Sequence, residues 1–369
     1  LMHMKQNDLI SITSKFKIKG TVSCIEPLGD GLINTTYKVI TKENSAPNYV
    51  LQLINNAVFP DVDMLMGNIV AVTNHIRKKL SEKGQSEPER HCLEFIPLAN
   101  DSGKYYFYDG SNYWRIMVFI EGTVTKSEVS ADSSYTVGLA FGDFESMLAD
   151  IPVELGETIK DFHNMEFRLQ QLREAVEQDK AGRAESVKYY IDEIERRAEN
   201  MTLGERLFRE GKLKKRICHC DTKVNNMLFD AKTDEVLCVI DLDTVMPNFV
   251  FSDFGDFLRT AANSGKEDDE NLDNVNFKID IFEAFARGYL KSAGSFLTET
   301  EINNLPYATA LFPYMQTVRF LADYINGDTY YKILYPEHNL VRTKAQFKLL
   351  QSVEEHYMEM KAIISSLSA

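Results

Sequence analysis

Two short segments carry side chains that could perform phosphoryl transfer. The first, His219 to Asn226, has the form H-x-D-x-K-x-x-N, and the second is an apolar stretch that ends in Asp241-Leu242-Asp243. Phosphoryl transfer needs a carboxylate to accept or orient a hydroxyl proton, a cation to offset charge on the moving group, and oxygen ligands for Mg²⁺. Asp221, Lys223, Asn226 and Asp241 supply these groups in order, which predicts a small-molecule kinase.

Each of these residues also has an ordinary structural interpretation. Asp221 alone would suit a helix N-cap, and its role as the base rests on the residues that follow it in register. Asn225 competes with Asn226 as a metal ligand, but the five-residue step from Asp221 favours Asn226. His219 is expected to brace the loop, and Asp243 is either a second metal ligand or a hydrogen-bonding partner behind the first.

Two further strings resemble functional motifs, but we interpret them as structural. Asp253-Phe254-Gly255 spells the metal motif of protein kinases, yet Asp241 already fills that role, so Asp253 is expected at a helix start. Cys218-His219-Cys220 has the wrong spacing for zinc, because alternate strand residues face opposite sides. The five cysteines form no C-x-x-C pair, so we expect no disulfide framework, and we expect Cys218 and Cys220 to be buried free thiols.

The elements that must position these groups divide the chain into two parts. Strands are expected at 21–27, 36–40, 49–54, 93–97, 105–108 and 114–120, with one long helix that starts after Pro60-Asp61 and ends at Gly84. Helices are expected at 131–149, 162–180, 184–200, 203–210, 277–293, 299–326 and 342–367. We therefore predict an α+β, bilobal, protein-kinase-like fold: a β-rich nucleotide-binding lobe (1–120) and a helical catalytic and substrate-binding lobe (121–369).

Composition limits the classes of partner. The net charge of −14 argues against nucleic acid and anionic membranes, both of which are bound through phosphate neutralisation. No apolar run approaches the length that spans a bilayer, and no charged-then-apolar leader is present. Together with the cysteine usage, this predicts a cytoplasmic protein. The expected partners are Mg-ATP and a small molecule, and the protein is expected to be a monomer or a small homo-oligomer.

The two segments resemble those of the aminoglycoside phosphotransferase and choline kinase superfamily, and the whole chain is most similar to N-acetylhexosamine 1-kinases. The second resemblance rests on these further strings: Gly29-Asp30-Gly31 with Ile33-Asn34-Thr35-Thr36-Tyr37, Ala140-Phe141-Gly142-Asp143-Phe144, Arg319-Phe320-Leu321-Ala322-Asp323-Tyr324, and Tyr335 to Thr343. The resemblance implies ATP-dependent transfer to the anomeric hydroxyl of N-acetylglucosamine or N-acetylgalactosamine, which yields the sugar 1-phosphate.

The resemblance also implies roles for individual residues. Asp221 would be the base, Asn226 and Asp241 would hold Mg²⁺, and Thr244, Arg319 and Tyr330 would line the sugar site. From the residues themselves we expect Lys223 to neutralise the γ-phosphate, and Asp243 is the further candidate for the metal. Nucleotide-binding positions would be Gly29, Gly31, Asn34, Thr35, Gln52, Phe119 and Glu121. One departure stands out: Gln52 occupies the place where many relatives carry a phosphate-binding lysine, and Asn68 stands near the place of its usual glutamate partner.

Two other functions fit the same residues. One is a kinase of this fold for another acceptor, such as choline, homoserine or an aminoglycoside. A choline site would use an aromatic cage and an aminoglycoside site an acidic rim. The other is an inactive kinase-like protein that binds nucleotide. The absence of the lysine motivates it, and the presence of Asp221, Asn226 and Asp241 argues against it.

Overall fold

The computed structural model describes residues 4–29 and 33–369 and divides the chain into two compact units. The sheet unit comprises Leu1–Thr125, Asp150–Ile159 and Met227–Val245, and the helical unit comprises Lys126–Ala149, Lys160–Asn226 and Met246–Ala369. The expected mixed α+β content is confirmed. The expected single boundary between 120 and 121 is simpler than this division, because two later segments return to the sheet unit.

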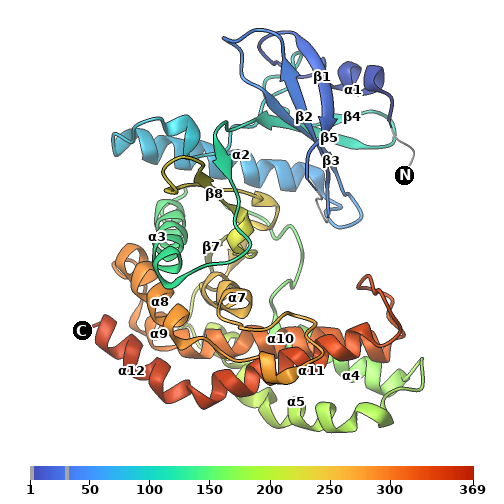
Figure 1. Ribbon diagram of the computed structural model, residues 1–369, viewed down its shortest axis with the longest axis vertical. Coiled ribbons are helices and arrows are strands. Elements are labelled where there is room, and N and C mark those ends of the chain that lie inside the picture. The colour runs from blue at the N-terminus through green and yellow to red at the C-terminus, as the bar shows by residue number, and fades with distance from the viewer. Residues whose placement is uncertain (1–3, 30–32) are drawn as a thin grey trace. The chain divides into compact units, whose positions relative to one another are not determined.

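An antiparallel five-stranded sheet forms the centre of the sheet unit, in the order β1-β2-β3-β5-β4 (Figure 1). Its strands are β1 (Val22–Pro27), β2 (Thr35–Thr41), β3 (Tyr49–Ile54), β4 (Phe107–Tyr108) and β5 (Tyr113–Val118). Helix α1 (Gln6–Thr13) packs on β1, and their apolar side chains join Trp114, which is fully buried, in one core. A second small sheet has the order β6-β8-β9, built from β6 (Thr123–Val124), β8 (Met227–Asp230) and β9 (Val236–Val239).

The long helix α2 (Val62–Glu82) confirms the helix expected from apolar spacing. Asp61 caps its first turn by accepting a hydrogen bond from the backbone N–H of Met64 at 2.9 Å. The expected apolar positions are all buried: Val62, Leu65, Ile69, Val72, Ile76 and Leu80. Because these side chains recur every three or four residues, they form one continuous buried face of the helix.

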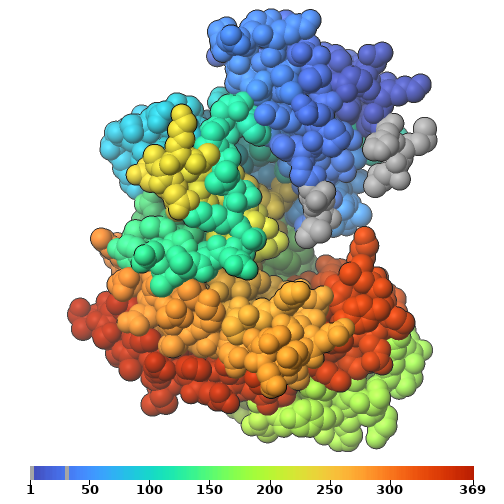
Figure 2. Space-filling model, viewed as in Figure 1, coloured from blue at the N-terminus to red at the C-terminus, as the bar shows by residue number. Residues whose placement is uncertain are grey.

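The helical unit contains ten helices within its described residues. They are α3 (Ala131–Leu148), α4 (Met165–Gln178), α5 (Lys188–Met201), α6 (Leu203–Arg209), α7 (Phe251–Ala261), α8 (Ile279–Ala293), α9 (Glu299–Asn303), α10 (Leu305–Ile325), α11 (His338–Glu355) and α12 (Tyr357–Leu367). One small sheet pairs β7 (Arg216–Cys218) with β10 (Met246–Asn248). Orange and red residues of the C-terminal helices cover much of the face of this unit seen in Figure 2.

Helices α3 and α8 approach closely because glycines meet at their contact (Figure 1). A Cβ atom on Gly138 would lie 2.5 Å from the carbonyl oxygen of Phe285, and one on Gly288 would lie 2.1 Å from that of Tyr135. Phe141 and Phe144 of α3 are buried, so their side chains form part of the core of the helical unit.

Several expected elements differ in extent from those observed, and the strand expected at 105–108 is shortened to Phe107–Tyr108. Residues 93–97 form only an isolated bridge from Phe95 to Met117, since Pro97 has no backbone N–H to continue a ladder. The helix expected at 299–326 is two helices, because Pro306 starts a new one at its first turn. The helix expected at 342–367 begins at His338 and is divided at His356, which has a non-helical backbone (ψ 7°).

No helix in the described ranges is both long enough and apolar enough to cross a bilayer.

Candidate active site

The loop after β7 brings Asp221, Lys223 and Asn226 together. The amide nitrogen of Asn226 donates hydrogen bonds to the backbone oxygen of Asp221 at 2.8 Å and to its Oδ2 at 3.2 Å. The Lys223 Nζ lies 3.3 Å from the same Oδ2. Asn226 is buried, whereas the side chain of Asp221 is 20% exposed. The loop therefore presents a carboxylate to solvent and holds it from one side by an amide and an ammonium group.

Asp253 anchors this loop from the first turn of α7. Its carboxylate accepts the backbone N–H of His219 at 3.0 Å and that of Cys220 at 2.8 Å. Its backbone oxygen accepts the hydroxyl of Thr222 at 2.7 Å. Cys220 has φ 67°, a left-handed conformation that is sterically unfavourable for a residue with a Cβ. Asp253, which is fully buried, thus compensates the unusual backbone just before Asp221, which is the structural role expected of it.

His219 supports the same loop from inside the unit. Its ring is buried and lies edge-on to both Phe141 and Phe144, with centroids 5.9 Å from each. Its Nδ1 accepts the backbone N–H of Asp221 at 3.2 Å. This contact fixes the start of the loop, in agreement with a bracing role.

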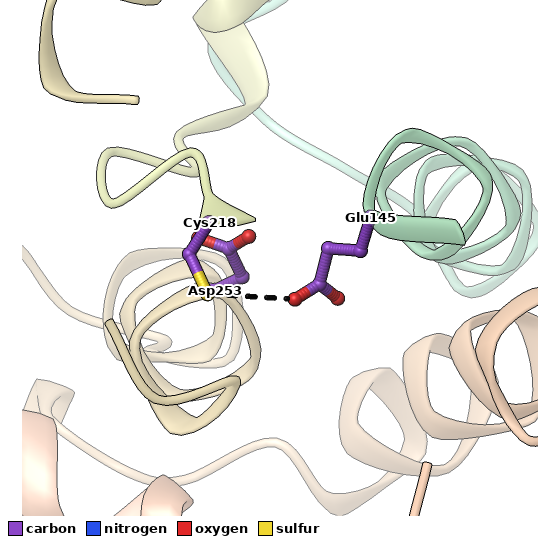
Figure 3. A group of neighbouring side chains, drawn as sticks. All are labelled: Glu145, Cys218 and Asp253. Atoms are coloured by element: carbon purple, nitrogen blue, oxygen red, sulfur yellow. Dashed lines mark hydrogen bonds between the residues drawn. The ribbon is translucent and has the colours of Figure 1, made fainter. Parts of the chain in front are cut away.

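Glu145, Cys218 and Asp253 form a buried cluster behind the loop (Figure 3). Burial raises the pKa of Glu145 and of the Cys218 thiol well above their usual values, and it raises the pKa of Asp253. The Cys218 thiol donates to Glu145 Oε2 at 3.7 Å. A metal ligand must be deprotonated, which this environment opposes. We therefore interpret the cluster as packing that supports the loop.

Asp241 and Asp243 both lie in the sheet unit, but they differ in their exposure to solvent. Asp241 is exposed and left-handed (φ 59°), and it precedes the short 3₁₀ turn Leu242–Thr244. Asp243 is buried, and both of its carboxylate oxygens accept hydrogen bonds from Arg115, at 2.5 and 3.0 Å. The Asn34 amide nitrogen also donates to Asp243 Oδ2 at 2.8 Å. These contacts favour the second role considered for Asp243, a partner behind the metal ligand.

The two positions that replace the usual lysine and glutamate are held by amide hydrogen bonds. Gln52 accepts the Nε–H of Arg115 at 2.9 Å and donates to Thr36 Oγ1 at 3.2 Å. Asn68 donates to the carbonyl of Gly156 at 2.7 Å and accepts its N–H at 3.1 Å. No ion pair links these two positions, and the buried cation of the described sheet unit is Arg115 instead.

The other expected nucleotide-binding residues lie on the same sheet unit. Gly29 has φ 66° with open space around its Cα, and Thr35 is exposed on β2, while Gly31 lies outside the described residues. Phe119 follows β5, with its ring beneath the ammonium of Lys38 at 4.1 Å. Glu121 accepts the Asn48 amide at 2.8 Å. Their roles toward a nucleotide stay predictions.

Arg319 and Tyr330 meet at a pocket of about 240 Å³ in the helical unit. The pocket is lined by Arg168, Gln171, Arg319, Ala322, Asp323, Asn326, Thr329, Tyr330 and Tyr331. The Arg319 guanidinium lies 5.7 to 6.0 Å from the ring centroids of Phe162, Tyr330 and Tyr331. No group in the described chain accepts a hydrogen bond from it, so its donors are available to a ligand. Thr244, the third residue expected at the sugar site, is buried in the other unit.

Arg168 adds a second cation to this pocket, and sequence reasoning missed it. Burial, followed by the positive charge of Arg319, lowers the pKa of Arg168 to about 10. The same causes lower the pKa of half-buried His163 well below its usual value, which disfavours a third positive charge beside the pocket. Arg168 and Arg319 lie on α4 and α10, far apart in sequence, and no local pattern links them. Arg115, also missed, did carry a signal: it is a charged residue inside an apolar strand.

A larger cavity of about 750 Å³ lies elsewhere in the helical unit. Val224 of the catalytic loop lines it, together with three cations, Arg259, Lys266 and Lys278, and three acids, Glu128, Glu267 and Asp269. No residue assigned from the sequence to substrate or nucleotide lines this cavity. Because Val224 of the catalytic loop lines this cavity, the cavity is a second candidate for the acceptor site.

The chain matches the phosphotransferase enzyme family (APH) over residues 25–293. It is similar in fold to spectinomycin phosphotransferase APH(9)-Ia, solved with ADP and spectinomycin (14% identity, 98% of this chain and 99% of that one, TM-score 0.55). It is also similar to amicoumacin kinase hAmiN, solved with AMP-PNP, Ca²⁺ and Ami (12%, 94% of each, 0.57), and to an ethanolamine kinase of Plasmodium vivax (15%, 89% and 84%, 0.52).

The matched range includes the catalytic loop and the Asp241 segment, whereas Arg319 and Tyr330 lie beyond its end. The protein-kinase-like fold expected from the sequence is confirmed by these structures. The chain belongs to the phosphotransferase enzyme family.

Proposed function

We propose that this kinase transfers the γ-phosphoryl group of ATP to the anomeric hydroxyl of an N-acetylhexosamine. The observation that carries the proposal is Arg319, whose guanidinium has no hydrogen-bond acceptor in the described chain and faces a pocket with aromatic walls. Its rigid set of donors suits ring hydroxyls and an acetamide carbonyl. Tyr330, which is 74% exposed, offers an aromatic surface to the sugar.

The charge of the pocket supports a neutral acceptor over a cationic one. Arg168 and Arg319 both carry positive charge there, and Asp323 is already occupied by the backbone N–H groups of Thr329, Tyr330 and Tyr331. Choline and aminoglycosides would meet repulsion from two guanidinium groups at this site. A neutral sugar with carbonyl and hydroxyl oxygens would not.

In the proposed reaction, the oxygen of the anomeric hydroxyl forms a bond to the γ-phosphorus, and Asp221 accepts the proton of that hydroxyl. The bond between this phosphorus and the β,γ-bridging oxygen breaks, and ADP leaves with the electron pair. The Asn226 amide holds the Asp221 carboxylate for this step. Lys223, 3.3 Å from Asp221, offsets negative charge that develops on the transferred group.

The oxygen donors of Asn226 and Asp241 are chemically suited to Mg²⁺. Because Asn226 uses its amide nitrogen on Asp221, its Oδ1 is left as a neutral oxygen ligand. Asp241 adds an exposed carboxylate oxygen from the end of an apolar strand. Hard oxygen donors of this kind are those that Mg²⁺ prefers. When bound, the ion would neutralise charge on the β- and γ-phosphates, and we propose Asn226 and Asp241 as its ligands.

An acceptor panel tests the proposal. Release of ADP is measured with N-acetylglucosamine, N-acetylgalactosamine, their parent hexoses, choline, ethanolamine and one aminoglycoside. The proposal expects turnover with at least one N-acetylhexosamine, and an Asp221→Asn variant that is slower by orders of magnitude. Turnover with a cationic acceptor alone would discard the sugar assignment.

Arg319→Ala and Arg342→Ala form a matched pair for the acceptor site. Both remove an arginine that lies over an aromatic ring, but Arg342 bonds to Asn339 and Lys332 and does not line the pocket. We expect Arg319→Ala to raise the sugar KM at least tenfold, with the KM for ATP unchanged, and Arg342→Ala to leave both close to wild type. A normal sugar KM in Arg319→Ala would move the acceptor to the 750 Å³ cavity.

A further inference from the structure

Arg115 is a fully engaged cation in the middle of strand β5. Its side chain is 3% exposed, and it lies directly opposite Gln52 in the β3–β5 register. Its Nε donates to Gln52 at 2.9 Å, and its two terminal nitrogens donate to the two oxygens of Asp243. The Phe95 ring lies 5.5 Å from the guanidinium carbon. A bidentate pair of this kind fixes both distance and orientation.

The pair is one of several contacts that hold the segment that follows β9. Asn34 donates to Asp243 Oδ2, while its own Oδ1 accepts the backbone N–H of Asn55 at 2.9 Å. The hydroxyl of Thr158 donates to the backbone oxygen of Asp243 at 2.8 Å. The side chain and the main chain of Asp243 are therefore both held by other residues of the sheet unit. Among these partners of Asp243, Arg115 is the charged one.

Asp241 depends on this arrangement because its own backbone is unfavourable. It adopts the left-handed conformation and is followed at once by the turn Leu242–Thr244, which contains Asp243. An aspartate in this conformation persists when its surroundings hold it there. Asp243 lies two residues beyond Asp241 and is buried, so a shift of Asp243 would rotate the exposed carboxylate of Asp241.

We infer that Arg115 is a positioning residue of the reaction, which sets the orientation of the metal ligand Asp241 through Asp243. The inference rests on the proposed function for the role of Asp241. The inference also accounts for Gln52, which stands where many relatives carry a phosphate-binding lysine. Here Gln52 orients the guanidinium of Arg115, and Arg115 in turn binds Asp243 of the D-x-D segment.

Stability alone does not explain such a pair. Replacing a buried ion pair by well-packed apolar residues is often neutral or stabilising, whereas removing one partner leaves an uncompensated buried charge. The double variant Arg115→Met with Asp243→Leu removes both charges together and keeps the volume filled. An effect of the double variant on metal binding can therefore be assigned to the orientation of Asp241 and not to a loss of stability. The single variant Arg115→Met would change both at once, because it leaves the charge of Asp243 buried without a partner.

The experiment compares wild type, the double variant, Asp241→Asn, and Arg90→Met as control. Arg90 also pairs with an aspartate of the returning segment, Asp230 at 2.8 Å, but this pair is more exposed and lies away from Asp241 in sequence. Binding of Mn²⁺ in the presence of ADP is measured by electron paramagnetic resonance, together with the thermal midpoint, kcat and the Mg²⁺ concentration for half-maximal rate.

We expect the double variant to keep a thermal midpoint close to that of wild type. Its Mn²⁺ affinity should fall at least tenfold and its kcat at least a hundredfold, as in Asp241→Asn, while Arg90→Met matches wild type. Wild-type Mn²⁺ affinity in the double variant would overturn the inference, and so would wild-type affinity in Asp241→Asn. If wild type turns over no sugar, the proposed acceptor fails, but the Mn²⁺ measurements still decide the role of Arg115.

Discussion

The anchoring of the catalytic loop by Asp253 makes a quantitative prediction for Asp253→Ala. In wild type, the carboxylate is fully buried and accepts the backbone N–H groups of His219 and Cys220. Removing it leaves two buried donors with no acceptor. It also releases the left-handed Cys220, directly before Asp221, from the group that holds it.

The magnitude follows from the two orphaned donors. Each unsatisfied buried group costs about 1–3 kcal/mol, so Asp253→Ala should lower the free energy of unfolding by about 2–6 kcal/mol. This is a large share of the roughly 5–15 kcal/mol by which folded proteins are stable. Because burial raises the pKa of Asp253, removing a disfavoured buried charge offsets part of the loss, and the lower half of the range is expected.

Urea unfolding of wild type, Asp253→Ala, Asp253→Asn and Asp280→Ala measures these differences. Asp253→Asn keeps one acceptor oxygen and should lose roughly half as much as the alanine variant. Asp280 is an exposed acid in the first turn of α8, and its removal should cost less than about 1 kcal/mol. In Asp253→Ala, kcat should fall much more than the KM of either substrate rises. A wild-type unfolding midpoint with normal kcat would refute the anchoring role.

Three further predictions concern stability. Gly288→Ala should lower the thermal midpoint by several degrees, because the new methyl group would lie 2.1 Å from the Tyr135 carbonyl, and an unchanged midpoint would contradict the tight helix contact. Burial raises the pKa of Asp256 to about 6, whereas the pKa in the unfolded chain is about 4. The free energy of unfolding of wild type should therefore fall, by up to about 3 kcal/mol, as the pH rises from about 4 to about 6. Urea titrations at these two pH values should show a smaller difference for Asp256→Asn than for wild type. Arg216→Met should cost about 3–5 kcal/mol, because it leaves buried Glu301 without its bidentate partner at 2.7 and 2.8 Å, and a loss below about 1 kcal/mol in urea unfolding would contradict this reasoning.

Much of the fold could be predicted from local patterns. Helix α2 follows from its apolar spacing and the Asp61 cap, and β3 and β5 follow from short apolar runs between turns. The catalytic loop could also be predicted, because Asp221, Lys223 and Asn226 lie within six consecutive residues. Residues this close in sequence can approach one another only in a few ways.

Features that depend on distant contacts could not be predicted. Arg115 pairs with Gln52 and Asp243 only through the register of β3 with β5 and the return of a later segment to the sheet unit. The pairing favours Asp243 as a hydrogen-bonding partner behind the metal ligand. Spacing alone also allowed Asp243 to be a second metal ligand. The pocket of Arg168 and Arg319 likewise needs two helices to pack side by side, which no periodicity in either helix reveals.

Phosphorus NMR of the reaction product tests the central claim most directly. Wild-type protein is incubated with Mg-ATP and N-acetylglucosamine or N-acetylgalactosamine, and the ³¹P spectrum is recorded with and without proton decoupling. The proposed function predicts a new phosphomonoester doublet coupled to the anomeric proton, absent in Asp221→Asn. A product coupled to another sugar proton, or no product while a different acceptor is phosphorylated, would contradict it.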